Sequence, residues 1–178
     1  MINKILRVAI KWFIILLRGR AEYARYIGVS IGENCRIYTT EFGTEPWLIS
    51  IGNKVTVTSG VVMLTHDGAT WLMNDEKGRR YSYKKIDVKD NVFIGINSII
   101  MPGVVIDKNV IIAAGSVVTK SIPSGVIVGG NPAKIIGDYY DYEKKVLANN
   151  VYNLNMKIPY KQRINNALEN TSKSYLNN

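Results

Sequence analysis

Residues 88–118 read VKDNVFIGINSIIMPGVVIDKNVIIAAGSVV, and every sixth residue of this stretch is isoleucine or valine. The periodic positions are Val88, Ile94, Ile100, Ile106, Ile112 and Val118. Neither an α-helix nor a single strand produces a strict period of six, because side chains repeat every 3.6 and every 2 residues in those elements. A parallel β-helix does produce it, since each short strand and its turn place one aliphatic side chain inside a narrow core. The stretch therefore predicts an all-β solenoid of hexapeptide repeats.

The fifth position of each repeat is also restricted, to small or β-branched residues that suit a tight inner corner. These positions are Val92, Ser98, Val104, Val110, Ser116 and Ile122. The pattern appears earlier in a different phase, at Ile31, Ile37, Ile51, Val57 and Met63. Its two breaks predict a bulge within residues 38–50 and a loop at 67–85. A plain surface insertion is one explanation of the loop, but Trp71 and Tyr81 favour a binding loop.

The repeat divides the 178-residue chain into three parts. We expect an N-terminal cationic helical segment at 1–28, the β-helix domain at 29–137, and a partly helical C-terminal tail at 138–178 with a helix near Pro159. The single cysteine, Cys35, occupies an inward fifth position and is expected to be a buried core residue rather than a nucleophile. We find no signal peptide and no apolar run that could span a bilayer, which makes the cytoplasm the expected location.

The net charge of +9 is concentrated near the N-terminus. Residues 1–26 hold six basic residues and one acid, Glu22, around the largely apolar stretch Val8–Leu17. Such a helix could cap the open end of the solenoid or contact another subunit. The alternative is peripheral contact with an anionic membrane through residues 1–20. A nucleic-acid partner is not expected, because no recognition motif accompanies the basic charge.

The chain has one histidine, His66, where the coil gives way to the loop at 67–85. A neutral imidazole accepts a proton from a hydroxyl or an amine near neutral pH, so His66 is the candidate general base. One histidine and one distant cysteine exclude a histidine-rich zinc site within one subunit, and no metal is expected. A Ser-His-Asp hydrolase is not favoured, because the sequence contains no G-x-S-x-G segment. Glu45 and Asp67 are both candidates to orient His66, and Glu45 reaches it more easily, because sequence neighbours on a strand point to opposite faces.

Several motifs together resemble the left-handed β-helix acyltransferases, over roughly residues 30–137. They are the hexapeptide ladder, the Thr65-His66 corner, and the segments VFIG at 92–95, AAGSVVTK at 113–120 and GGNPAK at 129–134. Within that family the chain is most similar to the maltose and galactoside acetyltransferases, and among these to enzymes that modify bacterial surface polysaccharides.

This resemblance implies a homotrimer that binds acetyl-CoA as co-substrate in clefts between subunits. His66 matches the catalytic base of the family. The positions that match its CoA contacts are Gly95, Ile96, Ala114, Thr119, Lys120 and Lys134, the last beside the nucleotide phosphates. Phe93 stands where sugar acetyltransferases often carry tryptophan. The segment 41–47 departs from their pattern, so the acceptor's identity does not transfer.

The sequence thus predicts direct O-acetyl transfer from acetyl-CoA to a sugar hydroxyl of a surface polysaccharide or its precursor. We expect Trp71, Tyr81, Lys84 and Lys85 of the loop to bind this sugar or glycan, and a backbone N–H near Gly95 to stabilise the oxyanion. One alternative keeps the mechanism but acetylates the amine of an amino-sugar nucleotide or another small hydroxyl compound. Another is a non-catalytic scaffold, which would not need the CoA-like ending of the repeat. Ice binding would need a flat array of threonines, and the sequence has none.

Overall fold

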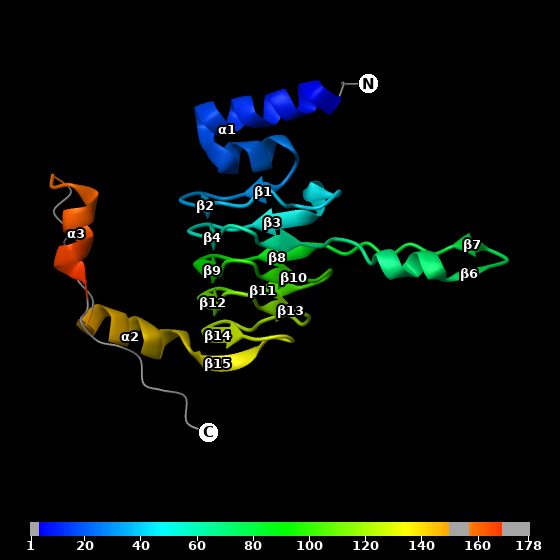
Figure 1. The fold of residues 1–178 in the computed structure, drawn as a ribbon. Coiled ribbons are helices and arrows are strands. Elements are labelled where there is room, and N and C mark those ends of the chain that lie inside the picture. The colour runs from blue at the N-terminus through cyan, green and yellow to red at the C-terminus, as the bar shows by residue number, and fades with distance from the viewer. Residues whose placement is uncertain (1–3, 150–156, 169–178) are drawn as a thin grey trace. The chain divides into compact units, whose positions relative to one another are not determined.

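Three sheets, parallel except for the last strand of the second, wrap around one axis to form the coiled body of the protein (Figure 1). A computed structural model describes residues 4–149 and 157–168, and its two compact units are Met1–Tyr140 and Asp141–Asn178. The first sheet contains β1 (Ser30–Ile31), β3 (Ile49–Ile51), β8 (Ile86–Val88) and β11 (Val105–Ile106). The second sheet contains β2 (Arg36–Ile37), β4 (Thr56–Val57), β9 (Val92–Ile94), β12 (Val110–Ile112), β14 (Val126–Gly129) and β15 (Lys134–Asp138). The third sheet contains β5 (Val62–Met63), β10 (Ile99–Ile100) and β13 (Val117–Val118).

The strand register explains the period of six. Val88 pairs with Ile106, Ile94 with Ile112, and Ile100 with Val118, so residues 18 apart lie side by side in successive coils. One coil therefore consists of three hexapeptides, one for each sheet. All six periodic aliphatic residues are buried, as are all six fifth-position residues. The predicted left-handed parallel β-helix is confirmed.

The turns between sheets carry a second periodic signal that the apolar pattern does not contain. Positive φ angles recur every six residues, at Asn91, Asn97, Gly103, Asn109 and Gly115. This left-handed conformation costs most L-residues roughly 1–2 kcal/mol, whereas glycine and asparagine adopt it readily. The asparagines also stack between coils, since Asn91 Nδ2 donates to Asn109 Oδ1 at 2.7 Å. The fourth position of each repeat is therefore selected for turning the chain.

The helix α1 (Lys4–Tyr26) lies at the N-terminal end of the coils. It is kinked at Gly19, where the backbone is not helical (φ 86°, ψ 174°). Ala24, after the kink, is fully buried against the first coils, so this part of the helix caps the core. At the other end of the coils, β15 pairs antiparallel with β14 and closes the second sheet.

Two helices follow the coils. They are α2 (Tyr139–Asn149) and α3 (Tyr160–Ala167), and α3 agrees with the helix expected near Pro159. The remaining parts of the predicted tail, 150–156 and 169–178, lie outside the described residues.

Both predicted interruptions leave the coil. Residues 38–50 contain the short helix η1 (Pro46–Leu48) and bury Phe42 in the core. Residues 67–85 form an arm made of η2 (Gly68–Leu72) and a hairpin of β6 (Asn74–Asp75) and β7 (Gly78–Arg79), which projects from the coils in Figure 1.

Cys35 differs from its expectation, because it is only partly buried. Its Sγ lies 3.1 Å from the carbonyl oxygen of Gly52, near the surface of the first coil. This coil has a neighbouring coil on one side only, which leaves the thiol less covered than the inward residues of the middle coils.

Candidate functional site

The two interruptions of the ladder meet at His66, just after β5. Glu45 comes from the bulge at 38–50, and its Oε2 lies 2.9 Å from His66 Nδ1. The same oxygen accepts a hydrogen bond from Thr65 Oγ1 at 2.6 Å, and Oε1 accepts one from Thr44 Oγ1 at 2.6 Å. The Glu45 side chain is 15% exposed and that of His66 is 42% exposed. A largely enclosed carboxylate therefore holds one edge of a solvent-accessible imidazole.

These contacts fix the charge of Glu45. The hydrogen bonds from Thr44 and Thr65, followed by the contact with His66, lower the pKa of Glu45 to about 2 against the opposing effect of burial. An ionised carboxylate only accepts hydrogen bonds, so Nδ1 of the imidazole must carry the proton that points to Glu45. In the neutral imidazole the lone pair then belongs to Nε2. This is the nitrogen that can take a proton from an acceptor.

The base of the arm builds a pocket beside His66. The chain returns antiparallel to its outward path, with Asp67 N donating to Ser82 O at 3.0 Å and Lys84 N to Thr65 O at 2.8 Å. This pairing places the Tyr83 ring 5.9 Å from that of His66, and Tyr81 stacks on Tyr83 at 6.3 Å between centroids. The pocket has a volume of about 260 Å³ and is lined by Thr44, Glu45, His66, Asp67, Gly68, Thr70, Arg79, Tyr81, Ser82 and Tyr83.

Of the other residues expected at this site, Asp67 and Tyr81 line the pocket and Trp71, Lys84 and Lys85 do not. Asp67 accepts a hydrogen bond from Ala69 N at 2.9 Å and caps η2, so its carboxylate supports the arm. Trp71 contributes to the arm without lining the pocket. Lys84 lies against Gly103 of the neighbouring coil, and Lys85 is exposed; neither lysine lines the pocket.

Arg79 is a pocket residue that the sequence reasoning missed. Its guanidinium lies 5.3 Å from the centre of the Trp71 ring and 4.7 Å from that of Tyr81. Cation–π contacts of this kind hold an arginine in place while leaving its N–H groups able to donate. The adjacent Arg80 instead pairs with Asp75. The signal in the sequence was a basic residue between two aromatic residues of an insertion.

Two of the residues matched to CoA binding lie on the turn between the second and third sheets. Ile96 and Ala114 are both exposed there, in successive coils linked by the hydrogen bond from Gly115 N to Ile96 O at 2.8 Å. Gly95 is buried directly against the next coil, where a β-carbon would lie 2.5 Å from Ala114 N. Gly95 N donates to Ile112 O at 2.8 Å, so this N–H is used by the sheet, and an oxyanion donor near Gly95 stays a prediction for another N–H.

Thr119 and Lys120 lie at the other edge of the third sheet, where its strands end. His66 lies at the same edge. The hydrogen bonds Leu64 N to Ile100 O and Met101 N to Val118 O stack the residues that follow β5, β10 and β13. Since parallel strands are spaced by 4.7–4.9 Å, two coils separate His66 from Thr119 and Lys120 by about 10 Å along the axis. Lys134 opens β15 and is exposed, as are Thr119 and Lys120. In the described ranges 4–149 and 157–168, no group of three or more His, Cys, Asp or Glu side chains could hold a metal ion.

Known proteins are similar to this chain in its repeat and its fold. The family model described as bacterial transferase hexapeptide (six repeats) matches residues 85–120. Protein CapG of Staphylococcus aureus is 48% identical over 131 residues, which cover 72% of this chain and 76% of CapG. Galactoside O-acetyltransferase of Escherichia coli is 33% identical over 100 residues, 56% of this chain and 49% of that enzyme, so the match spans about half of its length.

Solved structures agree with these sequence matches. A maltose O-acetyltransferase from Clostridium difficile 630 superposes with a TM-score of 0.50 at 26% identity, covering 68% of this chain and 75% of that one. A hexapeptide-repeat acetyltransferase from Vibrio cholerae gives a TM-score of 0.54 at 25% identity, covering 72% of this chain and 86% of that one.

Proposed function

The chain belongs to the bacterial transferase hexapeptide family and is an acyltransferase, and we propose that it transfers an acetyl group from acetyl-CoA to a sugar hydroxyl, with His66 as general base. The observation that carries this proposal is the contact between Glu45 and Nδ1 of His66 at the mouth of a pocket. The contact leaves Nε2 as the proton acceptor of a residue that lines the pocket. The names of the two O-acetyltransferase relatives support a sugar as the acceptor.

The proposed reaction is a direct transfer in two steps. The acceptor oxygen attacks the thioester carbonyl carbon as Nε2 of His66 takes the hydroxyl proton, which gives a tetrahedral oxyanion. The oxyanion collapses, the carbon–sulfur bond breaks, and the imidazolium returns its proton to the departing thiolate. Glu45 stabilises the imidazolium between these steps, because its carboxylate is ionised and 2.9 Å from Nδ1. Cys35 takes no part in the proposed transfer. It lies at the corner between the first and second sheets, whereas His66 lies at the corner that follows the third sheet.

Acetyl-CoA is proposed to bind between subunits of a homotrimer. Ile96 and Ala114 lie on one edge of the third sheet, and His66, Thr119 and Lys120 on the other. A single subunit therefore presents Ile96 and Ala114 on one edge of this sheet, and the base on the other edge with Thr119 and Lys120. Threefold assembly brings the edge of one subunit to the base of the next. Lys120 and Lys134 then supply positive charge for the phosphates of CoA.

The acceptor is proposed to be a sugar of a bacterial surface polysaccharide or its precursor, modified in the cytoplasm, where acetyl-CoA is made. Tyr81 and Tyr83 offer flat apolar surfaces to a sugar ring, and Arg79 offers hydrogen-bond donors to its oxygens. This arrangement supports sugar binding by the base of the arm. The remainder of the arm and the two lysines at 84 and 85 would contact a longer glycan.

The test is an acceptor screen with the purified full-length protein, acetyl-CoA and a thiol-detecting reagent. Mono- and oligosaccharides should release CoA, and NMR of the product should show an ester at one hydroxyl. If the product is instead an amino-sugar nucleotide acetylated at nitrogen, the acceptor group is an amine and the mechanism stays the same. If calorimetry detects no binding of CoA to the protein, the enzymatic proposal fails and a scaffold role takes its place.

A further inference from the structure

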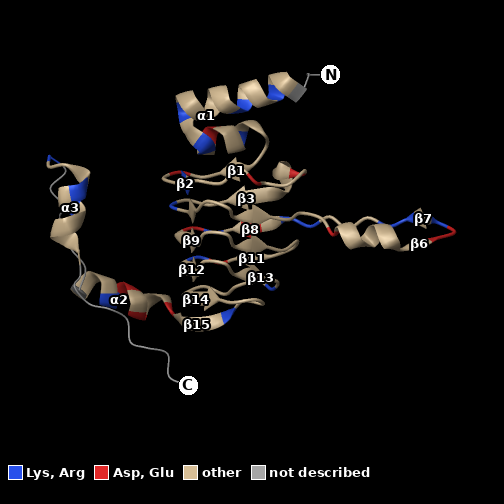
Figure 2. Cartoon of the chain, in the orientation of Figure 1, with Lys and Arg blue, Asp and Glu red and all other residues tan. Residues whose placement is uncertain are grey.

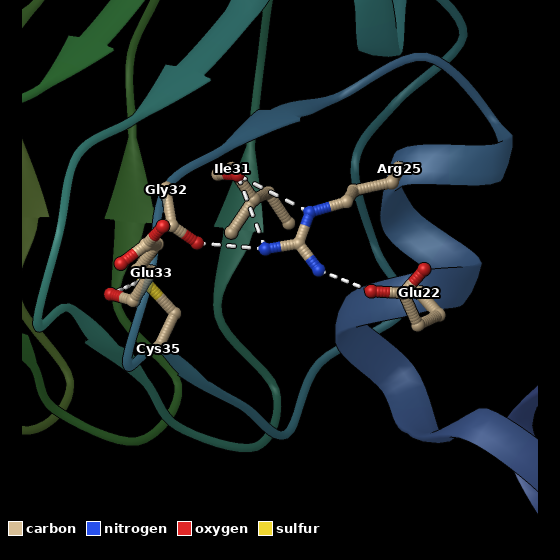
Figure 3. Close-up of polar contacts among 6 residues, drawn as sticks. All are labelled: Glu22, Arg25, Ile31, Gly32, Glu33 and Cys35. Carbon is tan, nitrogen blue, oxygen red and sulfur yellow. Dashed lines mark hydrogen bonds and ion pairs between the residues drawn. The ribbon is translucent and has the colours of Figure 1, made fainter.

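The kink in α1 separates a segment that is docked on the first coil from residues 5–18, none of which is fully buried. After Gly19, Arg25 ties the helix to the first coil, donating from Nε and Nη2 to Ile31 O at 3.2 and 3.1 Å and from Nη2 to Gly32 O at 2.7 Å (Figure 3). Arg25 also pairs with Glu22 within the helix. Before Gly19, Lys11 Nζ donates to Thr40 Oγ1 at 3.1 Å and lies 5.5 Å from the centre of the Tyr23 ring.

The segment before the kink points one apolar face away from the protein, whereas Ile10, Ile14 and Ile15 are partly buried. Ile5, Trp12 and Leu16 are 76%, 58% and 85% exposed and lie on one stripe of the helix, at i, i+7 and i+11. Val8 extends this stripe, and a neighbouring stripe is formed by Leu6, Phe13 and Leu17, all exposed. Lys11 lies on the opposite side and faces the coils. A helix that packed as an ordinary surface element would bury its apolar stripe and expose its lysine.

An exposed apolar face of this size indicates a binding surface, and the charge around it indicates what binds. The first acidic residue of the chain is Glu22, whereas basic residues occur at positions 4, 7, 11, 18 and 20. In Figure 2 the segment of α1 before the kink carries basic residues without acidic ones. A second copy of the helix on this face would bring two sets of positive charges together. An anionic lipid surface neutralises them instead.

The length of the helix indicates how it would meet the lipid. No helix among the described residues is long and apolar enough to cross a membrane. We propose that residues 4–18 lie flat on an anionic bilayer, with the stripes of Trp12, Leu16 and Phe13 in the headgroup region, while residues 20–26 hold the coils against it. This inference rests on α1 alone and does not depend on the reaction at His66.

The experiment measures flotation of the full-length protein with vesicles of phosphatidylcholine, with and without phosphatidylglycerol. The wild-type protein should bind the phosphatidylglycerol vesicles and bind the neutral ones at least about tenfold more weakly, since several cations contribute. Leu16→Gln combined with Phe13→Gln should remove binding to both. Arg18→Gln combined with Arg20→Gln should reduce the preference for phosphatidylglycerol at least about tenfold, because two of the five cations are removed, and keep the weak binding to neutral vesicles.

A matched control is Leu147→Gln in α2, because Leu147 is 78% exposed, close to the exposure of Leu16. It should bind vesicles as the wild type does. Thermal unfolding and CoA binding of all variants should stay unchanged, since every substituted side chain is exposed. Equal binding of the wild type and the Phe13/Leu16 variant would overturn the proposal. So would a wild type that ignores vesicles but dissociates into smaller oligomers on substitution of Phe13 and Leu16, since the face would then bind a second copy.

Discussion

The coils from β8 to β13 and the arm at 67–85 place opposite demands on their residues. In the coils, a β-carbon added to Gly95 would lie within 2.5–2.8 Å of three backbone atoms of the next coil. In the arm, Gly68 and Gly78 have no atom within 4 Å of the same position, and the large side chains are exposed. Packing therefore dictates the coil sequence almost residue by residue. The arm is free to vary, so its residues are more informative about what the protein binds.

The largest expected effect is at His66, where the two regions join. His66→Ala should lower kcat/KM by about 10³-fold or more, because general-base catalysis contributes 10²–10⁴ and no neighbouring side chain replaces the imidazole. The Kd of CoA should change less than about twofold, since the residues matched to CoA lie on the coils. Thiol release measures the first quantity and calorimetry the second.

His66→Gln keeps the size and polarity of the side chain without its basicity, and it should be as inactive as the alanine variant. Thermal unfolding of both should stay within a few degrees of the wild type, because the imidazole is partly exposed and its contact with Glu45 is a single pair. Turnover within about tenfold of the wild type in either variant would contradict the role of His66 as base.

A pair of glycine substitutions compares the two regions through stability. Gly95→Ala should destabilise the protein by about 3 kcal/mol, because the coils must separate to admit the methyl group, and should lower Tm by about 10 °C. Gly68→Ala should leave Tm within about 2 °C of the wild type, because its surroundings are open and its φ is negative. Differential scanning calorimetry of the two variants decides the matter. Equal Tm values would show that close contact between coils does not limit the ladder.

The coils could be predicted from sequence because their packing is periodic. The period of six implies that Val88 and Ile106 are paired, as the structure shows, because three hexapeptides, one for each face, complete one coil around a narrow core. The asparagines at 91, 97 and 109 carried an equally regular signal in the turns, which an apolar pattern does not detect. The kink of α1 left a weaker trace, a single glycine at 19 within a run that is otherwise good for a helix.

The site was less predictable because it is made of exceptions to the repeat. His66 stood out as the only histidine in the sequence. Glu45 was favoured as its partner because strand alternation turns Asp67 away from His66. Arg79 could not be found in this way. Its place in the pocket follows from how the arm folds back, which depends on the pairing of residues 65–67 with 82–84, and no periodicity encodes that pairing.

A further pair of substitutions distinguishes the roles of the two carboxylates beside the imidazole. Glu45→Gln should lower kcat by about 10²-fold, since an amide N–H facing Nδ1 favours the wrong tautomer and the imidazolium loses its counter-charge. Asp67→Asn is the matched control and should lose less than about fivefold, because asparagine also caps helices. Steady-state kinetics of both variants tests this. Comparable losses would show that Asp67 acts on the imidazole and does not only cap η2.

The pH dependence of stability provides an independent check on Glu45. The pKa of Glu45 is lowered to about 2, so its stabilising contribution is complete above pH 4.5 and is lost as the pH falls toward about 2. The difference in Tm between the wild type and Glu45→Gln should therefore be constant above pH 4.5 and shrink at lower pH. A difference that grows on acidification would mean that the carboxyl group is protonated in the folded protein.

The smallest expected effect lies within the arm itself. Arg79→Gln should raise the KM for the sugar acceptor by about tenfold and leave kcat and the KM for acetyl-CoA nearly unchanged, because Arg79 lines the pocket without contacting the Glu45–His66 pair. Arg80→Gln removes an equal charge one residue away, where the side chain pairs with Asp75 outside the pocket, and should leave all three constants unchanged. A tenfold rise in both variants would mean that the arm attracts the acceptor through its overall charge. A rise for Arg79 alone would show that the least constrained region of the chain selects the acceptor through one positioned side chain.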